Sequence, residues 1–449
     1  MNLENIRNNR IKMILQFSVP SIIAMVLTAC INIVDGFFTG NYVGSSGMSA
    51  IEMGLPIVYL YLALGLMFAV GGIAIAGREF GAGNMDKCKA VFNQTFVVST
   101  GVSIVLSIII FIIIVPVLRL LGISGEISSY FISYYRILLL ELPLMIINST
   151  LGMFIRGEGR PDFYMNTCIL TLILNAILDY IFAALLHQGI AGIAFSSFLA
   201  ALITFFINIF FIVKRAKVYR FGSFKFDKDV HKEMIFNGSS EFIGELTMVI
   251  SMLAYNYVIL KHFGSDGLCA FTIVGFVTYV FSMIIIGFGQ GIVPLVSFVY
   301  GAGEINTGIA IRRSTIKMTT AISLITMLLM VFLSNAYCTA FVKDPVIISM
   351  ARNGILIYMF SFPFVSINGI SSMYFTAIGN AKASAIISSS RGLVLLLIAI
   401  FTFPVLWGIT GLWLVGPVVE GLTILITLHY ILSEKKNLLS GNIMNKQSA

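Results

Sequence analysis

Charged side chains are scarce in this sequence, and their scarcity excludes most soluble folds. Lysine, arginine, aspartate and glutamate together make up 11% of the 449 residues, whereas hydrophobic residues make up 58%. Soluble domains carry roughly 25% charged residues. The chain must therefore bury most of its apolar surface in lipid, and it is predicted to be a polytopic membrane protein.

Cysteine and histidine are too few and too scattered to indicate a metal or redox site. The five cysteines are odd in number, and no pair has metal-binding or redox spacing. The four histidines do not cluster. A membrane-embedded enzyme would need a catalytic pair or a metal cluster, and no His-rich or Ser/Lys arrangement supplies one. The sequence therefore predicts neither an enzyme nor a cofactor.

Long hydrophobic runs are abundant and recur twelve times. Each run is long enough for an α-helix that crosses the roughly 30 Å hydrocarbon core of a bilayer. The first run continues to full spanning length without a small-residue cleavage site, so no cleavable signal peptide is predicted. The predicted spans cover residues 14–38, 51–77, 91–115, 131–155, 164–186, 190–213, 234–260, 271–297, 315–335, 350–376, 384–406 and 411–432.

The net charge of +8 is spread unevenly over the segments between these spans. If the N-terminus lies inside, all but five of the lysines and arginines fall in cytoplasmic segments. Positive residues accumulate on the cytoplasmic side of membranes, so both termini are predicted to be cytoplasmic. This basic charge favours contact with anionic lipid headgroups and does not indicate nucleic acid. The five exceptions are Arg119, Arg136, Lys261, Lys343 and Arg352.

The basic segment 214–232 separates two halves of six predicted spans, and the halves resemble each other at an offset of 220 residues that slips to 219 near the end. An even number of spans returns the chain to its starting side, so the halves must be parallel repeats about an axis along the membrane normal. The clearest matches pair Gly44 with Gly264, Gly159 with Gly379, and Gly189 with Gly408.

The repeat predicts an all-α membrane protein of two six-helix bundles. We expect an N-terminal lobe over residues 1–220 and a C-terminal lobe over residues 221–449. The two lobes would face a central cavity and rock between states open to either side of the membrane.

The predicted span 164–186 is apolar enough to cross a bilayer, yet it carries Asn175 and Asp179 on one helical face. A second acid, Asp35, lies on the first span. A carboxylate inside a span costs roughly 2.5–3.5 kcal/mol, so an intramembrane acid marks a functional site by default. The alternatives are a packing pair for Asp179 and, for Asp35, a side chain that reaches the outer interface.

Helical rise places Asp35 and Asp179 in the outer half of the N-terminal lobe, where they could share one site. Such a site can take up a proton, or bind Na⁺ with Asn175 as a neutral oxygen ligand. The repeat counterparts of the three residues are not acidic, so the ion-coupling site is predicted in one half alone. Earlier on the first span, Pro20 removes a backbone hydrogen bond and permits either a hinge or a passive kink.

Residues suited to a promiscuous substrate cavity occur on the first span and on the first two spans of the second half. Methionine adapts its shape to its neighbours, and aromatic faces attract cations. Any one of these side chains could instead face lipid or pack against another helix. The predicted cavity residues are Thr28, Asn32, Glu245, Met248, Met252, Tyr255, Tyr279 and Met283.

With these features the chain resembles the multidrug and toxic compound extrusion (MATE) family, most closely its bacterial MepA-type and DinF-type members. The resemblance covers essentially the whole chain. It rests on the twelve spans in two halves, on Pro20 with Asp35, on REFGAGN after the second span, on FIRGEGRPDFYMN at 154–166, and on NAILDY at 175–180.

The resemblance implies a secondary antiporter that exports lipophilic or cationic drugs in exchange for H⁺ or Na⁺. Asp35, Asn175 and Asp179 match the cation-coupling cluster of the family, and Pro20 matches its bend in helix 1. A related branch also uses acids in the C-terminal lobe. Here only Glu245 is a counterpart, and the tenth span has no aspartate.

Two other kinds of membrane protein are weighed against the antiporter. A flippase for a lipid-linked precursor would need a more cationic cavity than the few basic residues within these spans provide. A channel would need a repeated selectivity element, whereas the acids here belong to one half. The expected partners are therefore small organic cations or lipophilic drugs and membrane lipids, with no nucleic acid, and the protein is predicted to be a monomer.

Overall fold

The computed structural model describes residues 1–120 and 122–439, and helices make up nearly all of these residues. Within this part of the chain, ten helices are long and apolar enough to cross a membrane. Two of the ten, Lys228–Gly301 with 74 residues and Ala381–Leu438 with 58, each contain a non-helical glycine and are long enough for two spans. The prediction of an all-α protein with twelve spans is therefore confirmed.

The helices follow one another with short connections in both halves of the chain. The first half contains α1 (Leu3–Asn8), α2 (Arg10–Tyr42), α3 (Ser45–Gly81), α4 (Met85–Leu120), α5 (Gly125–Gly157), α6 (Pro161–Asp179), the π-helix η1 (Tyr180–Leu185) and α7 (Gly189–Lys214). The second half contains α8 (Lys228–Gly301), α9 (Ile305–Phe341), α10 (Pro345–Tyr358), the 3-10 helix η2 (Met359–Ser361), α11 (Phe362–Ala377), α12 (Ala381–Ser389), the π-helix η3 (Ser390–Val394) and α13 (Leu395–Leu439).

Several helices begin at a residue whose side chain accepts hydrogen bonds from the first free backbone N–H groups. Asp227 accepts from Asp229 N at 2.9 Å and from Val230 N at 3.2 Å at the start of α8. Asp344 does the same for α10, where Pro345 occupies the first helical position. A short polar side chain before a hydrophobic run is thus enough to set these starts.

Glycines with positive φ angles end or break helices at matching positions in the two halves. Gly264 (φ 64°) breaks α8, and its repeat counterpart Gly44 (φ 96°) lies between α2 and α3. Gly408 (φ 60°) breaks α13, and its counterpart Gly189 has the same φ angle. Glycine adopts this conformation without the steric cost of a Cβ atom. The sequence repeat therefore corresponds to a repeat of backbone turns.

The chain forms two compact units that do not coincide with simple halves. The larger unit contains residues 1–246, 286–311 and 376–379. The smaller unit contains residues 247–285 and 312–375 and the chain from Asn380 onward. The predicted lobe boundary at residue 220 and the central cavity between the lobes stay predictions.

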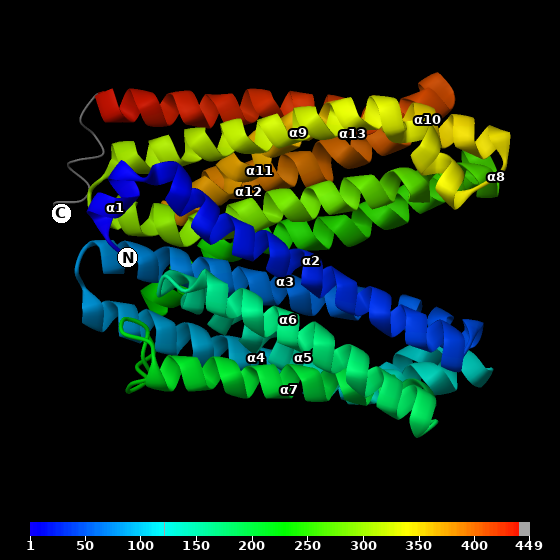
Figure 1. The fold of residues 1–449 in the computed structure, drawn as a ribbon, viewed down its shortest axis with the longest axis horizontal. Coiled ribbons are helices and arrows are strands. Elements are labelled where there is room, and N and C mark those ends of the chain that lie inside the picture. The colour runs from blue at the N-terminus through cyan, green and yellow to red at the C-terminus, as the bar shows by residue number, and fades with distance from the viewer. Residues whose placement is uncertain (121, 440–449) are drawn as a thin grey trace. The chain divides into compact units, whose positions relative to one another are not determined.

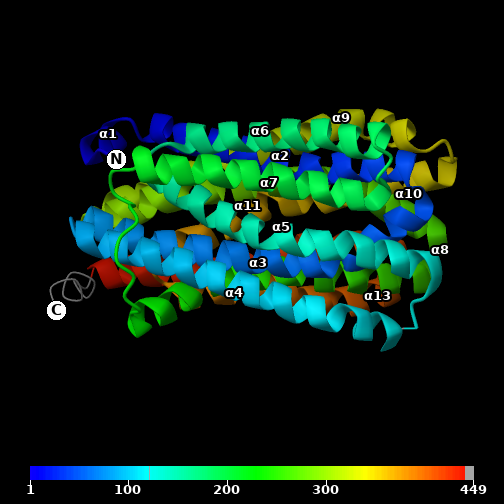
Figure 2. The same cartoon turned by 90° about the horizontal axis from the view of Figure 1, so that it is seen from below.

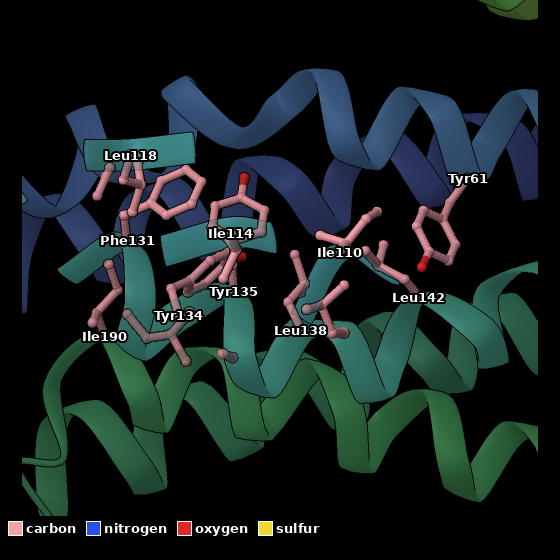
Figure 3. Packing of buried hydrophobic residues seen from close by; sticks show 14 of the residues in the cluster. Tyr61, Ile110, Ile114, Leu118, Phe131, Tyr134, Tyr135, Leu138, Leu142 and Ile190 are labelled. Atoms are coloured by element: carbon pink, nitrogen blue, oxygen red, sulfur yellow. The ribbon is translucent and has the colours of Figure 1, made fainter. Parts of the chain in front are cut away.

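In the larger unit, helices α2 to α7 run alongside one another (Figures 1 and 2). Helix α5 lies against α3, α4 and α7, while α6 lies against α2 and α7. Figure 3 shows the apolar core between α3, α4, α5 and α7, in which Tyr134 and Tyr135 of α5 pack with their rings 5.2 Å apart. Tyr135 also donates a hydrogen bond to Ile51 O at 2.8 Å, so the core fixes α5 against α3.

The connector between the two halves, residues 215–227, is fastened to the larger unit through its backbone. The Glu158 carboxylate accepts hydrogen bonds from Lys217, Val218 and Tyr219 N at 2.6–3.0 Å. Gln94 forms two hydrogen bonds with the backbone of Asp227, at 2.7 and 3.0 Å. These contacts fix the connector near both of its ends, at residues 217–219 and at Asp227. From the sequence, this segment could be described only as polar and basic.

Candidate functional site

The three residues predicted to couple ions lie on two helices that pack against each other in the larger unit. Asp35 is on α2 and is 8% exposed, whereas Asn175 and Asp179 are on α6 and are fully buried. Helices α2 and α6 are in extensive contact. Residues 175 and 179 face the same side of α6 because they are four positions apart. The structure therefore brings all three predicted side chains together.

Asp35 accepts hydrogen bonds from the neighbouring helices α6 and α7. Asn175 Nδ2 donates to Asp35 Oδ1 at 3.0 Å, and Ser197 Oγ of α7 lies 3.2 Å from Asp35 Oδ2. Asn175 Nδ2 also lies 3.0 Å from Ser197 Oγ. Buried polar groups of this kind need such partners, because an unpaired polar group in the protein interior costs free energy. Asn175 and Ser197 thus hold the Asp35 carboxyl group in a defined position.

The carboxyl group of Asp179 lies against that of Asp35 and is also contacted by Ser196 of α7. Asp179 is the last residue of α6, and the chain then continues as the π-helix η1. π-Helical turns are rare and frequently occur at functional sites. This turn starts where the two acids meet.

The chemistry of the cluster suits a small cation that prefers oxygen. Asn175 Oδ1 and Asp179 Oδ2 are buried and have no hydrogen-bond partner among the residues that the structure describes. The ion pairs found among the described residues include none to Asp35 or Asp179. Two carboxyl groups in contact share negative charge unless a proton or a cation neutralises it. Carboxylate and carbonyl oxygens are ligands that hard cations prefer.

No group of three or more histidine, cysteine, aspartate or glutamate side chains in the described part of the chain could hold a metal ion. A Na⁺ ion at this cluster would therefore depend on the two carboxyl groups together with the Asn175 amide and a serine hydroxyl. The predicted ligand set includes Asp35, Asn175 and Asp179 but omits that hydroxyl.

Sequence reasoning missed three polar residues around the acids. Ser196 and Ser197 are adjacent in the apolar helix α7. Only the folded structure shows that their hydroxyl groups donate hydrogen bonds to Asp179 and Asp35, respectively. Glu141 of α5 is a third acid whose charge reaches Asp35, and within the described ranges its buried Oε2 atom has no hydrogen-bond partner. The sequence does carry a signal for Glu141, because this acid lies in the middle of the predicted apolar span 131–155.

The structure does not bring the predicted cavity residues together as it does the three predicted ion-coupling residues. Helix α2 continues through Pro20, so a hinge there stays a prediction. Among the predicted cavity residues, Tyr255 and Met283 are buried and Glu245 is partly buried. The remainder, Thr28, Asn32, Met248, Met252 and Tyr279, are exposed. These residues are divided between the two units, so their grouping around a substrate stays a prediction.

The model of one protein family, MatE, matches this chain twice, over residues 20–181 and 242–402. The two matches cover the two halves identified from the repeated glycines, and together they include most of the chain.

Curated relatives are bacterial export proteins. The chain is 26% identical over 412 residues to the multidrug export protein MepA of Staphylococcus haemolyticus, covering 89% of this chain and 88% of the relative. It is 25% identical over 411 residues to MepA of Staphylococcus aureus, again covering 89% of this chain and 88% of the relative.

Solved structures share the fold at lower sequence identity. A MATE crystal structure described as the bent conformation has a TM-score of 0.89 and 22% identity, covering 97% of this chain and 98% of that one. A transporter of the MOP superfamily from Pyrococcus furiosus, described as having a binding pocket of reversed polarity, has a TM-score of 0.88 and 21% identity. That match covers 95% of this chain and 96% of the other.

Proposed function

We propose, from the premise that this chain belongs to the MATE family, that it exports lipophilic and cationic compounds in exchange for H⁺ or Na⁺. Family membership makes the chain a multi-pass membrane transporter of the MepA type and not an enzyme. The resemblance drawn from the sequence is confirmed at this level. Family membership does not specify antiport, the coupling ion or the residues that bind the ion, and we propose these.

The observation that carries the proposal is the contact between two buried carboxyl groups that form no ion pair with a basic side chain in residues 1–120 and 122–439. Asp35 and Asp179 lie against one another, and Asn175 and Asp179 keep unpartnered oxygen atoms beside them. Charge buried in this way requires neutralisation, and an exchangeable cation is the simplest source. We assign the ion-coupling role to Asp35, Asn175 and Asp179, and the role of hinge to Pro20.

The proposed cycle is competition between substrate and ion through conformation. Substrate binds a state open to the cytoplasm, the carrier turns outward, and an external cation then neutralises the acid pair. Helix α2 rearranges around Pro20, and substrate affinity falls. Coupling needs only that ion and substrate favour different states, because a ligand shifts an equilibrium by its differential affinity. In this proposal, Tyr255 and Met283 are among the residues that line the substrate cavity. Both termini lie in the cytoplasm.

The test is efflux of a fluorescent organic cation from proteoliposomes under an imposed pH or Na⁺ gradient. We expect one gradient to drive efflux by the wild-type protein and the Asp179→Asn variant to lose gradient-driven transport. The matched control is Asp266→Asn, because Asp266 is an exposed acid. Equal transport by Asp179→Asn and wild type would remove the ion site. No transport under either gradient would favour export of a lipid-linked precursor.

A further inference from the structure

The smaller unit contains the buried carboxyl group of Glu420, which forms an ion pair with Arg391 of the same unit. Arg391 of η3 donates to Glu420 Oε1 of α13 from Nε at 2.9 Å and from Nη2 at 2.5 Å. Asn368 of α11 donates to Glu420 Oε2 at 2.8 Å. The Glu420 side chain is 11% exposed and that of Arg391 is 26% exposed. This acid is therefore neutralised within the chain.

The surroundings of Glu420 repeat a pattern from the first half of the chain. Asn368 Nδ2 also donates to Glu420 O at 3.0 Å, and Thr427 Oγ1 donates to Asn368 Oδ1 at 2.7 Å. The repeat counterparts form the same two contacts: Asn148 donates to Ala201 O at 3.0 Å, and Asn208 donates to Asn148 Oδ1 at 3.1 Å. The backbone frame is therefore shared by both halves.

The two halves differ in the charges placed on this frame. Glu420 occupies the position of Ala201, and Arg391 occupies the position of Thr171. Arg391 thus lies four residues before Leu395, the counterpart of Asn175. The second half has lost the acid pair of the first half and has instead an acid with a tethered guanidinium group.

We propose that Arg391 is a tethered counter-cation that occupies Glu420 permanently and so prevents Glu420 from binding an exchangeable H⁺ or Na⁺. This inference rests on the proposed function, in which a mobile cation neutralises Asp35 and Asp179. It makes Arg391 a specificity-determining residue, because Arg391 removes Glu420 from the acids that can exchange a cation. Removal of the guanidinium group leaves a buried carboxylate that needs another positive charge.

The first experiment counts cations bound to purified protein, using ²²Na⁺ equilibrium binding and, in parallel, potentiometric proton uptake. The Arg391→Gln variant is expected to gain one cation equivalent relative to wild type, as Na⁺ or as a proton. The double variant Arg391→Gln/Glu420→Gln is expected to return to the wild-type count. The matched control is Arg352→Gln, which removes an exposed arginine of the same unit. A folded Arg391→Gln protein with the wild-type count would overturn the proposal.

A second experiment does not depend on the folding of a protein with an unpaired Glu420. The double variant replaces the ion pair by neutral side chains that keep hydrogen-bonding capacity. Its ratio of cations exchanged per substrate is expected to equal that of wild type, measured from the substrate gradient at which net flux stops. A ratio that falls by one cation means that Glu420 is itself a coupling site, which contradicts the proposal.

The two proposals can fail separately. In an Asp179→Asn background, the cation gained by Arg391→Gln is still expected, because it is bound in the other half. If Asp179→Asn transports normally while Arg391→Gln gains a cation, then the ion site of the first half is wrong and the tethered cation stands. If Asp179→Asn is inactive and Arg391→Gln gains nothing, the reverse holds.

Discussion

At the scale of single residues, Asp35 depends on side chains from two other helices to hold its carboxyl group. Asn175 and Ser197 reach it from α6 and α7 at 3.0 and 3.2 Å. Groups that orient a cation ligand contribute to the affinity for the cation, and their loss commonly costs 10–100-fold. The coupling affinity of this protein is therefore expected to depend on residues that carry no charge.

The Ser197→Ala variant tests this dependence. It removes one hydrogen bond to Asp35 and keeps both acids, so we expect the half-saturating concentration of the coupling cation to rise about tenfold. The maximal rate of efflux should change less, because the acids that bind the ion remain. Kinetics of gradient-driven efflux at varied cation concentration measure both values. Thr402→Ala is the control, since Thr402 is exposed and its hydroxyl donates to Ile398 O of its own helix. An unchanged half-saturating concentration would contradict the role given to Ser197.

At the candidate site, the sequence identified Asp35 and Asp179 but not the third acid, Glu141, nor the two serines that contact the acid pair. A charge within an apolar run stands out, so Asp35 and Asp179 could be found without a structure. Ser197 could not, because serine is common in spanning helices and often bonds only to its own backbone. Glu420 and Arg391 are 29 positions apart, and their pairing appears only when α11, η3 and α13 are folded.

At the scale of helices, close contact between α3 and α5 is allowed by the absence of a side chain at Gly54. A Cβ atom there would lie 1.9 Å from Tyr135 Cζ and 2.1 Å from its hydroxyl oxygen. Tyr135 cannot simply move away, because it is fully buried and donates to Ile51 O on α3. The position of α5 in the core of Figure 3 therefore depends on this glycine.

The Gly54→Ala variant should lower the thermal stability of the purified protein. Overpacking of this kind typically costs about 1–3 kcal/mol. Gly101→Ala on α4 is the matched control, because Gly101 is exposed and has open space around its Cβ position. A helical glycine replaced by alanine without a clash gains about 0.5–1 kcal/mol. The melting temperatures of the two variants should therefore move in opposite directions, and a stable Gly54→Ala protein would mean that α3 and α5 can separate at little cost.

Helix number and type could be predicted from the sequence, whereas the irregular turns could not. Hydrophobic length alone identified the twelve spans, because a bilayer sets the length of a helix. The π-helices after Asp179 and around Arg391 were not predicted, because hydrophobic length does not distinguish a π turn from the α-helix around it. Both carry or adjoin residues of the two charged centres, so the least predictable elements are those nearest to the proposed chemistry.

At the scale of the whole molecule, the contact between the two acids bears on the energy source for export. Two carboxyl groups that share one cation exchange a single positive charge for a monovalent substrate, and no net charge crosses the membrane. A pH difference of one unit then supplies about 1.4 kcal/mol. Independent use of both acids would instead add about 2.3 kcal/mol for each 100 mV of membrane potential.

We expect export of a monovalent cation to be insensitive to membrane potential. The measurement is the initial rate of efflux from proteoliposomes in which valinomycin and K⁺ gradients impose a potential at constant pH and Na⁺ gradients. Rates that agree at zero and at strongly polarised potentials support one shared cation. An interior potential that changes the rate steeply would mean that each acid carries a cation of its own.

The fastened connector has a consequence for anyone who wishes to label or divide this transporter. Its backbone at Lys217, Val218 and Tyr219 is held by Glu158, and Asp227 is held by Gln94, so these positions behave as part of the folded first half. Residues 223–226 between them are exposed. An epitope tag or a split point is therefore best placed within those four residues, whereas the same insertion a few positions earlier would displace three backbone hydrogen bonds.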